Sequence, residues 1–418
     1  MNQCRLLSAC MVLAVMLSRP SLHGQVNSWQ AIGPEGGSLA GIVQDPTNAN
    51  ILYGVIDEAP SRVYRSTDHG TTWTLRGTAP TNYSGGMTLM IDRTTTSKLT
   101  LAANNELYRS TDGGQQWTQF GIPTGVSLWH VMMDPSSSQT FHGVGGRWES
   151  SKTYPVYHKT TDGGVTWSTT NIISEEGSPV MLGAAGNVVF VSIYSYATGT
   201  YLLYRSTNGG TDFVERTGTI HEYMSAALVD PSTPSRAWVS SYAGVYRTTD
   251  TGENWTLNNG YIYSISEISL QSGNPGRLFA SGYFDGVFTS SDAGVNWTLH
   301  LSGLWGNAGR GLVVEPSPSN YLFSARNAGI FRSSDGGQDW QPCHSGIAAA
   351  RVVTVRMAPS QPSVVYTAVD DDAVYRTTGI GNIPVTWQRL GNFMHCGYVN
   401  DIAVSPTDAG KAYAVGGT

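Results

Sequence analysis

Hydrophobic and polar residues alternate along most of this chain, in short runs that end at Gly, Pro, Asn or Asp. The first set has four such runs, at residues 39–45, 51–56, 62–66 and 73–76. β-Branched and aromatic residues fill these runs, as is typical of strands. No stretch shows a sustained apolar period of 3.6 residues, so no long helix is expected. The pattern predicts an all-β protein in which each set supplies four antiparallel strands.

A motif of eight residues follows the third strand of each set. It reads Ser/Thr-x-Asp-x-Gly-x-x-Trp and first occurs at residues 66–73. Two degenerate copies lie at 206–213 and 377–387, and the terminal aromatic residues recur at steps of 42 to 50 residues, counted from Trp29. The six good copies carry their acidic residue at Asp68, Asp112, Asp162, Asp250, Asp292 and Asp335. A period of this length indicates an array of repeated structural units.

Four antiparallel strands in each repeat predict the blades of a β-propeller. A strand of the fourth type opens the chain at residues 29–32, eight complete repeats follow, and residues 401–415 supply the first two strands of a ninth. We expect one propeller domain over residues 25–418 that is incomplete at its C-terminal end, with the possibility of a further domain beyond Thr418. A ring of eight or nine blades, and a ring of seven followed by the start of a second, both agree with this count.

The chemistry of the motif is that of a turn. An Asp carboxylate can accept hydrogen bonds from nearby backbone N–H groups, and the Gly two positions later can take a positive φ. The Trp begins the fourth strand and can pack between blades. A catalytic or calcium site would need several of these carboxylates at one point, whereas the repeats distribute them one to a blade. We therefore predict a structural role for all six Asp residues.

Residues 1–24 have the pattern of a secretory signal peptide. Arg5 precedes an apolar run from Leu6 to Leu17 that is too short to span a bilayer, and cleavage near Gly24 is expected. A lipoprotein cleavage box at residues 7–10 is the disfavoured alternative, because it would leave only nine residues upstream. We predict a secreted or extracytoplasmic protein without a transmembrane helix.

Two cysteines, Cys343 and Cys396, remain after the predicted cleavage. They lie in neighbouring repeats, and an exported protein can form disulfides, so both the bonded and the free state are open. The chain carries a formal net charge of −6 and only 13% charged residues, with no basic cluster, which excludes nucleic acid and a membrane surface as partners. Metal-ligand, phosphate-loop and CxxC patterns are missing, so we expect no cofactor and no metal.

Strand order separates two faces of the predicted propeller. The motif lies between the third and fourth strands (C and D) and shares a face with the turns between A and B. The D–A and B–C loops form the opposite face, with insertions at 145–155 and 194–201. These loops are rich in aromatic residues, which suit saccharides and also dominate protein hot spots; the alternative is that some fill the central channel. The candidate ligand-binding residues are Trp129, His130, Trp148, Tyr223, Tyr263, Tyr283, Trp305, Arg326 and Tyr398.

The repeated motif is identified as the Asp-box, or BNR, repeat. The opening, Trp29-Gln30-Ala31-Ile32-Gly33 through Asp45-Pro46 to Val63-Tyr64-Arg65, resembles xyloglucanase-type glycoside hydrolases. Over residues 29–418 the chain also resembles exported sortilin-like, Vps10-type repeat proteins. The first resemblance implies that Asp57 is catalytic, although Glu58-Ala59-Pro60 replaces the Gly-Gly of that family.

Two functions follow from these patterns. The favoured one is a secreted propeller that binds extracellular polysaccharide or protein through the D–A/B–C face. The alternative is a glycoside hydrolase acting on β-glucan, which needs two carboxylates about 5–10 Å apart. Asp57 would be one, and Asp285 or the run at residues 370–372 would be the other. An Arg-Ile-Pro motif and an arginine triad are lacking, which disfavours a sialidase.

Overall fold

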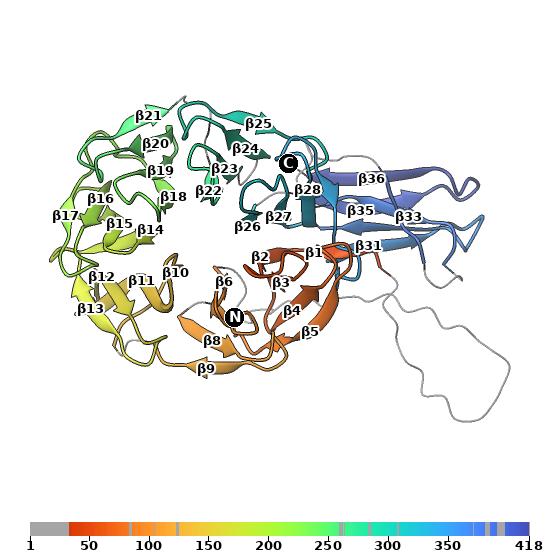
Figure 1. The fold of residues 1–418 in the computed structure, drawn as a ribbon. Helices are drawn as coiled ribbons and strands as arrows, with labels where there is room; N and C mark the ends of the chain where they lie inside the picture. The colour runs from red at the N-terminus through yellow and green to blue at the C-terminus, as the bar shows by residue number, and fades with distance from the viewer. Residues whose placement is uncertain are drawn as a thin grey trace. The chain divides into compact units, whose positions relative to one another are not determined.

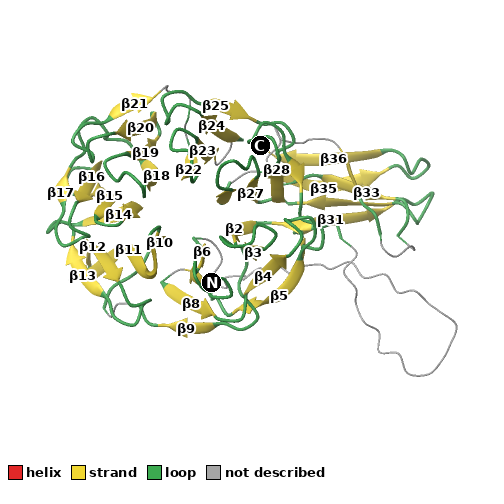
Figure 2. Cartoon of the chain, in the orientation of Figure 1, coloured by secondary structure: helices red, strands yellow, loops and turns green. Residues whose placement is uncertain are grey.

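The structure, a computed structural model, describes residues 33–417 apart from 83–85, 104, 123–124, 259–261, 263, 283–285, 307–308, 371, 381–384 and 391–397. The described residues form strands, turns and loops, and no helix (Figure 2). Within them there is accordingly no helix that is long and apolar enough to cross a membrane. Eight four-stranded antiparallel sheets and one two-stranded sheet, β35–β36, follow the repeats in order. The prediction of an all-β propeller with eight complete repeats and a partial ninth is confirmed.

The chain divides into two compact units. The first comprises Leu39–Arg326 and Ile330–His344, and the second comprises residues 1–38, 327–329 and 345–418. Seven of the four-stranded sheets lie in the first unit, and we number them blades 1 to 7 in chain order. Within each blade the strands pair in sequence order, A to D, as the repeat predicts.

The strand bounds agree closely with the alternation in the sequence. Blades 1 to 4 are β2 (Leu39–Gln44), β3 (Leu52–Ile56), β4 (Ser61–Ser66) and β5 (Thr74–Ala79); β6 (Thr88–Ile91), β7 (Leu99–Ala103), β8 (Glu106–Ser110) and β9 (Thr118–Phe120); β10 (His130–Asp134), β11 (Ser137–Glu149), β12 (Lys152–Thr160) and β13 (Ser168–Asn171); β14 (Gly177–Ala185), β15 (Val188–Ser195), β16 (Thr200–Ser206) and β17 (Val214–Glu215). Blades 5 to 7 are β18 (Met224–Val229), β19 (Ala237–Ser241), β20 (Gly244–Thr248) and β21 (Thr256–Asn258); β22 (Ile265–Leu270), β23 (Leu278–Gly282), β24 (Val287–Ser290) and β25 (Thr298–His300); β26 (Gly311–Val314), β27 (Leu322–Arg326), β28 (Gly329–Ser333) and β29 (Gln341–Pro342).

The seven blades of the first unit close into a ring. Strand β2 packs against β6 on one side and against β26 and β27 on the other, so blades 1 and 7 are neighbours (Figure 1). Each blade takes its four strands from one continuous stretch, so no strand is exchanged across the closure. Of the blade counts that the sequence left open, the structure therefore has the ring of seven.

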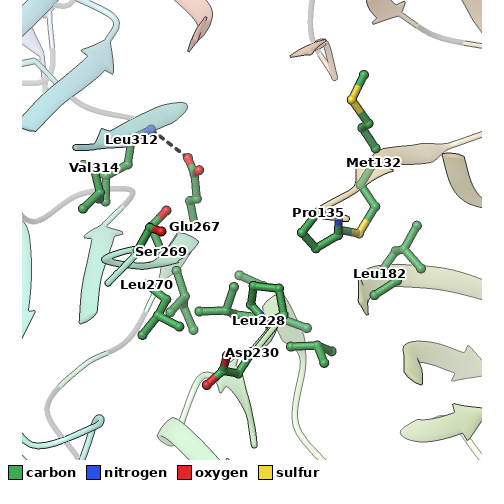
Figure 3. A pocket seen from close by; sticks show the side chains of 18 of the residues that line it. Met132, Pro135, Leu182, Leu228, Asp230, Glu267, Ser269, Leu270, Leu312 and Val314 are labelled. Carbon is green, nitrogen blue, oxygen red and sulfur yellow. Dashed lines mark hydrogen bonds between the residues drawn. The ribbon is translucent and has the colours of Figure 1, made fainter. Parts of the chain in front are cut away.

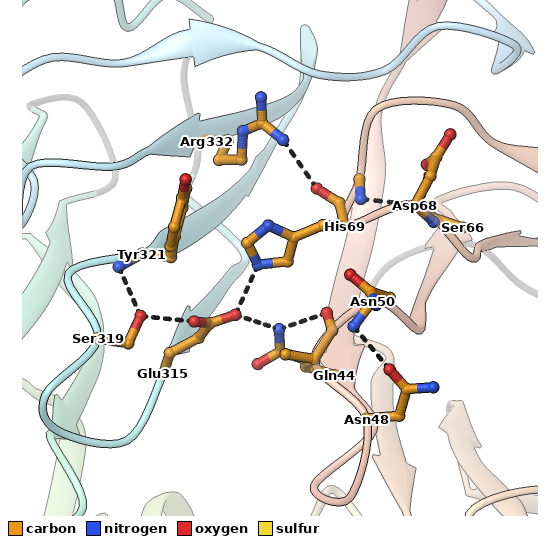
Figure 4. Close-up of polar contacts among 12 residues, drawn as sticks. Gln44, Asn48, Asn50, Ser66, Asp68, His69, Glu315, Ser319, Tyr321 and Arg332 are labelled. Carbon is orange, nitrogen blue, oxygen red and sulfur yellow. Dashed lines mark hydrogen bonds and ion pairs between the residues drawn. The ribbon is translucent and has the colours of Figure 1, made fainter.

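The contact that closes the ring repeats the contact between other blades. A basic side chain in the C strand of one blade donates a hydrogen bond to the Asp-box of the next blade. The acceptor is the backbone carbonyl of the residue that directly follows the Asp. This bond joins Arg109 to Gly163 O (2.5 Å) and Arg205 to Thr251 O (2.8 Å). Across the closure Arg332 donates to His69 O (3.0 Å), and the His69 imidazole lies 2.7 Å from the Glu315 carboxylate (Figure 4).

Apolar side chains fill the space between adjacent blades. Between blades 1 and 2, for example, Tyr53, Val55 and Val63 pack with Leu99 and Leu101 in one buried cluster. Burial of such side chains is the main favourable contribution to stability. The polar atoms that must enter this core are paired: the Trp73 indole N–H donates to Gly70 O at 3.1 Å and to Cys343 O at 2.6 Å, between blades 1 and 7.

The second unit holds the eighth repeat and the start of a ninth. Its four-stranded sheet is β31 (Val352–Met357), β32 (Val365–Val369), β33 (Val374–Thr377) and β34 (Gln388–Leu390). Strands β35 (Tyr398–Val404) and β36 (Ala412–Gly417) pair with each other, as predicted for residues 401–415, and β35 packs against β31. A short parallel pair, β1 (Gly36–Gly37) with β30 (Ala348–Ala349), was not anticipated. The predicted strand at 29–32 and the boundary at residue 25 lie outside the described residues.

Candidate ligand-binding site

The Asp-box carboxylates accept hydrogen bonds from residues of their own turns. In blade 1, Asp68 Oδ1 accepts bonds from the Ser66 hydroxyl and the Thr72 N–H, both at 2.8 Å, and Oδ2 accepts one from the Thr72 hydroxyl at 2.6 Å. Gly70, at φ +78°, donates its N–H to the Ser66 hydroxyl at 2.9 Å. Turn N–H groups are bonded in the same way to Asp112, Asp162, Asp250, Asp292 and Asp335.

These hydrogen bonds also set the charge of the carboxylates. Bonds from the backbone and side chain of Asn254 and from Thr248 lower the pKa of Asp250 to about 2, since they favour the ionised form. Among the described residues, no group of three His, Cys, Asp or Glu side chains is placed to hold a metal ion. Each Asp-box carboxylate therefore stabilises the turn of its own blade.

Long hairpins mark the opposite end of blades 3 and 4. The predicted B–C insertions form the tips of β11–β12 and of β15–β16, two of the longest strand pairs in the ring. At the first tip, Trp148 is 63% exposed, and the Arg147 guanidinium lies 5.6 Å from the ring centroid of Tyr154. Arg147 also donates to the Asn171 side chain at 3.0 Å. Aromatic surface is thus presented to solvent at the B–C end of blade 3.

Five tyrosines meet at the same end of blades 4 and 5, and we call them the tyrosine cluster. The members come from the β15–β16 hairpin, the loop before β18 and the β19–β20 turn. Ring centroids of successive members are 5.7, 5.0, 5.5 and 5.2 Å apart, in the order Tyr196, Tyr194, Tyr201, Tyr223 and Tyr242. The two end members are exposed, Tyr196 by 49% and Tyr242 by 63%, whereas the three inner ones are partly buried.

The loops around the tyrosine cluster are acidic. Segments 172–178, 194–201, 217–224 and 241–244 contain Glu175, Glu176 and Glu222 but no Lys or Arg. Burial, and then the charge of Glu222, raises the pKa of Tyr246, which belongs to the buried cluster that Tyr201 packs against. Burial and the neighbouring tyrosines likewise raise the pKa of Tyr201 and Tyr223. The cluster therefore combines aromatic surface with negative potential.

A cavity of about 780 Å³ lies along the inner strands of the ring. Apolar side chains surround it: Met132, Leu182, Leu228, Leu270 and Val314 (Figure 3). Glu267 and Asp230 are the acids of the lining; the Glu267 Oε2 accepts the Leu312 N–H at 2.8 Å, and burial raises the pKa of Glu267 to about 7. The sequence analysis did not include Glu267, because it considered loop residues and Glu267 lies in an inner strand. An acidic residue within an otherwise uncharged strand is a signal that could have identified it.

The predicted catalytic carboxylate makes an ion pair. Asp57 Oδ2 lies 2.5 Å from Arg310 Nη1, and the Asp57 side chain is only 11% exposed. Because Asp57 follows β3 of blade 1 and Arg310 precedes β26 of blade 7, this ion pair lies at the ring closure. Asp285 lies outside the described residues. In the second unit, Asp370 pairs with Arg351 at 3.1 Å and Asp372 with Arg389 at 3.1 Å.

The predicted ligand-binding residues separate into several environments. Trp148 is exposed, Tyr223 belongs to the tyrosine cluster, and Trp129 is half-buried against Gly146. His130 begins β10 and lines the inner cavity. Trp305 is half-buried and packs edge-on against Phe331, with ring centroids 4.8 Å apart. Tyr263 and Tyr283 lie outside the described residues, as does the side chain of Tyr398 in β35.

Arg326 requires a correction. It was expected to contact ligand, but it is only 2% exposed, at the end of β27, and its Nε donates to Gly306 O at 3.0 Å. The side chain serves the interior of blade 7, where a surface ligand cannot reach it. Cys343 is likewise buried, with a free thiol whose pKa burial raises to about 12, while Cys396 lies outside the described residues.

Comparison with known proteins agrees with this fold. The family model described as "Sortilin, neurotensin receptor 3," matches residues 61–176. YCF48 bound to D1 peptide is similar to the chain at 15% identity and a TM-score of 0.51, over 72% of this chain and 94% of that one. The extracellular domain of the putative one-component system BT4673 from B. thetaiotaomicron is similar at 12% identity and a TM-score of 0.52, over 86% of this chain and 47% of that one.

A weaker structural match is the GH74 xyloglucanase from Xanthomonas campestris, at 16% identity and a TM-score of 0.43, over 88% of this chain and 72% of that one. A comparison with curated proteins gives no match. At these identities the structural matches establish the fold alone. The protein is a β-propeller built from Asp-box repeats.

Proposed function

We propose that this chain is a secreted binding module that recognises an extracellular polysaccharide or protein through the B–C/D–A end of blades 3 to 5. The observation that carries this proposal is the tyrosine cluster, with Tyr196 and Tyr242 exposed at its two ends. Tyrosine offers a large, rigid contact surface at low cost in conformational entropy, and it combines apolar area with a hydroxyl group. Trp148 is exposed at the same end of the neighbouring blade 3.

The environment of Asp57 supports binding over hydrolysis. A glycosidase needs one carboxyl group that can deliver a proton and a second carboxylate across the scissile bond. The Asp57 carboxylate is instead held by the Arg310 guanidinium at 2.5 Å, in an ion pair between blades 1 and 7. YCF48, a propeller of the same fold, has been solved bound to a D1 peptide, so a peptide site on such a fold has a precedent.

Affinity electrophoresis tests the proposal. The purified chain and a Tyr223→Ala/Tyr242→Ala variant are run through gels that contain xyloglucan, another β-glucan or sialylated mucin, and a random peptide library provides the protein arm. Tyr413→Ala is the matched control, because Tyr413 lies on β36 of the second unit and is 71% exposed. We expect binding in one arm that the double variant loses and the control keeps.

Three results would contradict the proposal. Binding that the double variant retains would place the site elsewhere, and no binding in any gel or in the library would remove the function. A cleared zone in a stained glucan gel, abolished in Asp57→Ala, would establish the hydrolase instead.

A further inference from the structure

The loops of the tyrosine cluster have the composition of a cation-binding surface. Segments 172–178, 194–201, 217–224 and 241–244 hold five Tyr and three Glu, one His, and no Lys or Arg. The faces of aromatic rings attract ammonium and guanidinium groups, and carboxylates add to that attraction. These segments carry no fixed cation of their own that could pair with an acidic ligand; Arg147, on the blade 3 hairpin, donates to Asn171 just before the first segment.

Glu222 adds a negative charge next to the tyrosine cluster. Its Oε2 is buried and has no hydrogen-bond partner among the described residues. Glu222 directly precedes Tyr223, an inner member of the cluster. Because the Glu222 Oε2 is buried, a ligand cannot reach it, and Glu222 acts on a bound cation through its charge.

The ring orientations argue against a neutral glycan as the ligand. A sugar chain stacks best on a row of open ring faces, but Tyr194 and Tyr196 meet at 70° and Tyr201 and Tyr223 at 88°. Only Tyr223 and Tyr242 are stacked, at 28°. Edge-to-face pairs leave alternating faces and hydroxyl groups, which suit the side chains of a peptide. The four steps of 5.0 to 5.7 Å between centroids span at most the length of about six extended residues.

We propose that the tyrosine cluster binds an extended, basic segment of a protein partner, with Arg or Lys side chains over the tyrosine faces and attracted by the charge of Glu222. This inference rests on the proposed function, and it specifies the ligand of that site. The exposed ring of Tyr242 would receive one cation. Glu222 would attract the same cation through its charge, because its buried Oε2 is closed to a ligand.

Selection from a peptide library tests the ligand class. A phage library of random 12-residue peptides is selected on the purified chain, and the best peptide is labelled with fluorescein for anisotropy titration. We expect Arg and Lys to be enriched over the unselected library, and replacement of these residues by Gln in the labelled peptide to abolish binding. Tyr242→Ala and Glu222→Gln should each weaken binding about tenfold, the size expected of one cation–π contact or one nearby charge.

The controls separate this inference from the function beneath it. Tyr413→Ala should bind the peptide like the unaltered chain, and circular dichroism should show that Tyr242→Ala, an exposed substitution, keeps the fold. Peptides selected without basic enrichment, or unchanged affinity in Tyr242→Ala, would overturn the inference. Retardation by a polysaccharide that depends on Tyr223 and Tyr242, without basic peptides, would overturn it while leaving the binding function intact.

Discussion

The contact between Glu315 and blade 1 makes a quantitative prediction about ring closure. The Glu315 side chain is 8% exposed, and its carboxylate interacts with the Gln44 amide (2.6 Å), the His69 imidazole (2.7 Å) and the Ser319 hydroxyl (2.6 Å) (Figure 4). Two of these three groups belong to blade 1. These bonds lower the pKa of Glu315 against the effect of burial, so the carboxylate is ionised at neutral pH.

Replacing Glu315 by Ala removes all three bonds, so the His69 imidazole loses this partner in a partly buried seam and the Gln44 amide keeps only its bond to Ala49 O. Loss of one partner from such a network costs about 3–5 kcal/mol of the free energy of unfolding. Glu315→Gln keeps an acceptor oxygen and should cost about 1–2 kcal/mol. Glu58→Ala is the control: Glu58 pairs with Arg62 in the same blade, both side chains are 29% exposed, and its loss should cost less than about 1 kcal/mol.

Urea unfolding followed by tryptophan fluorescence gives these differences, and amide hydrogen exchange locates them. In Glu315→Ala we expect faster exchange in β2 and β26 than in β14 and β18, which lie away from the closure. A cost below about 1 kcal/mol, or exchange that rises equally in every blade, would refute the idea that this network closes the ring.

Three further predictions follow from the blades. Gly210→Ala should cost about 2–4 kcal/mol of unfolding free energy, because Gly210 has φ +91° and a Cβ would meet the buried Tyr157 ring at 1.9 Å; Gly186→Ala, with open space around it, should cost less in the same urea titration. Glu267 has a folded pKa raised to about 7, so its contribution to stability is present below about pH 4.5 and is lost as pH rises through 7; Glu267→Gln should flatten urea midpoints measured between pH 5 and 8. Asp250 has a folded pKa lowered to about 2, so its contribution is lost as pH falls from 4 to 2; Asp250→Asn should reduce that loss in acid titrations followed by circular dichroism, since Asn208 already fills this position in blade 4.

The repeat pattern predicted the blades because each rests on local chemistry. Ser66, Asp68 and Gly70 fix one turn without help from distant residues, so strands and turns could be read from the sequence. Ring closure could not, because the eighth repeat has the same strand pattern as the seventh. The distinction lies in the contact of His69 with Glu315, 246 positions apart. His69 does occupy a motif position that is Gly, Thr or Ala in the other good copies.

The sequence predicted the face of the propeller that carries the candidate site better than it predicted the individual residues. Strand order placed the B–C and D–A loops together, which brought Tyr223 and Trp148 into the prediction. Tyr242 was missed because its B–C turn is short and shows no insertion. Arg326 was included because it ends a B strand at the same face, but side-chain direction at a strand end depends on packing, and here the guanidinium turns to Gly306 O.

Hydrogen–deuterium exchange of the complex tests the central claim most directly. The chain is compared with and without a saturating ligand, either the selected peptide or the polysaccharide that retards it. We expect protection concentrated in residues 194–201, 217–224 and 241–244, with the Asp-box turns unchanged. Protection confined to the inner strands around Glu267, or to the loop that carries Asp57, would contradict it.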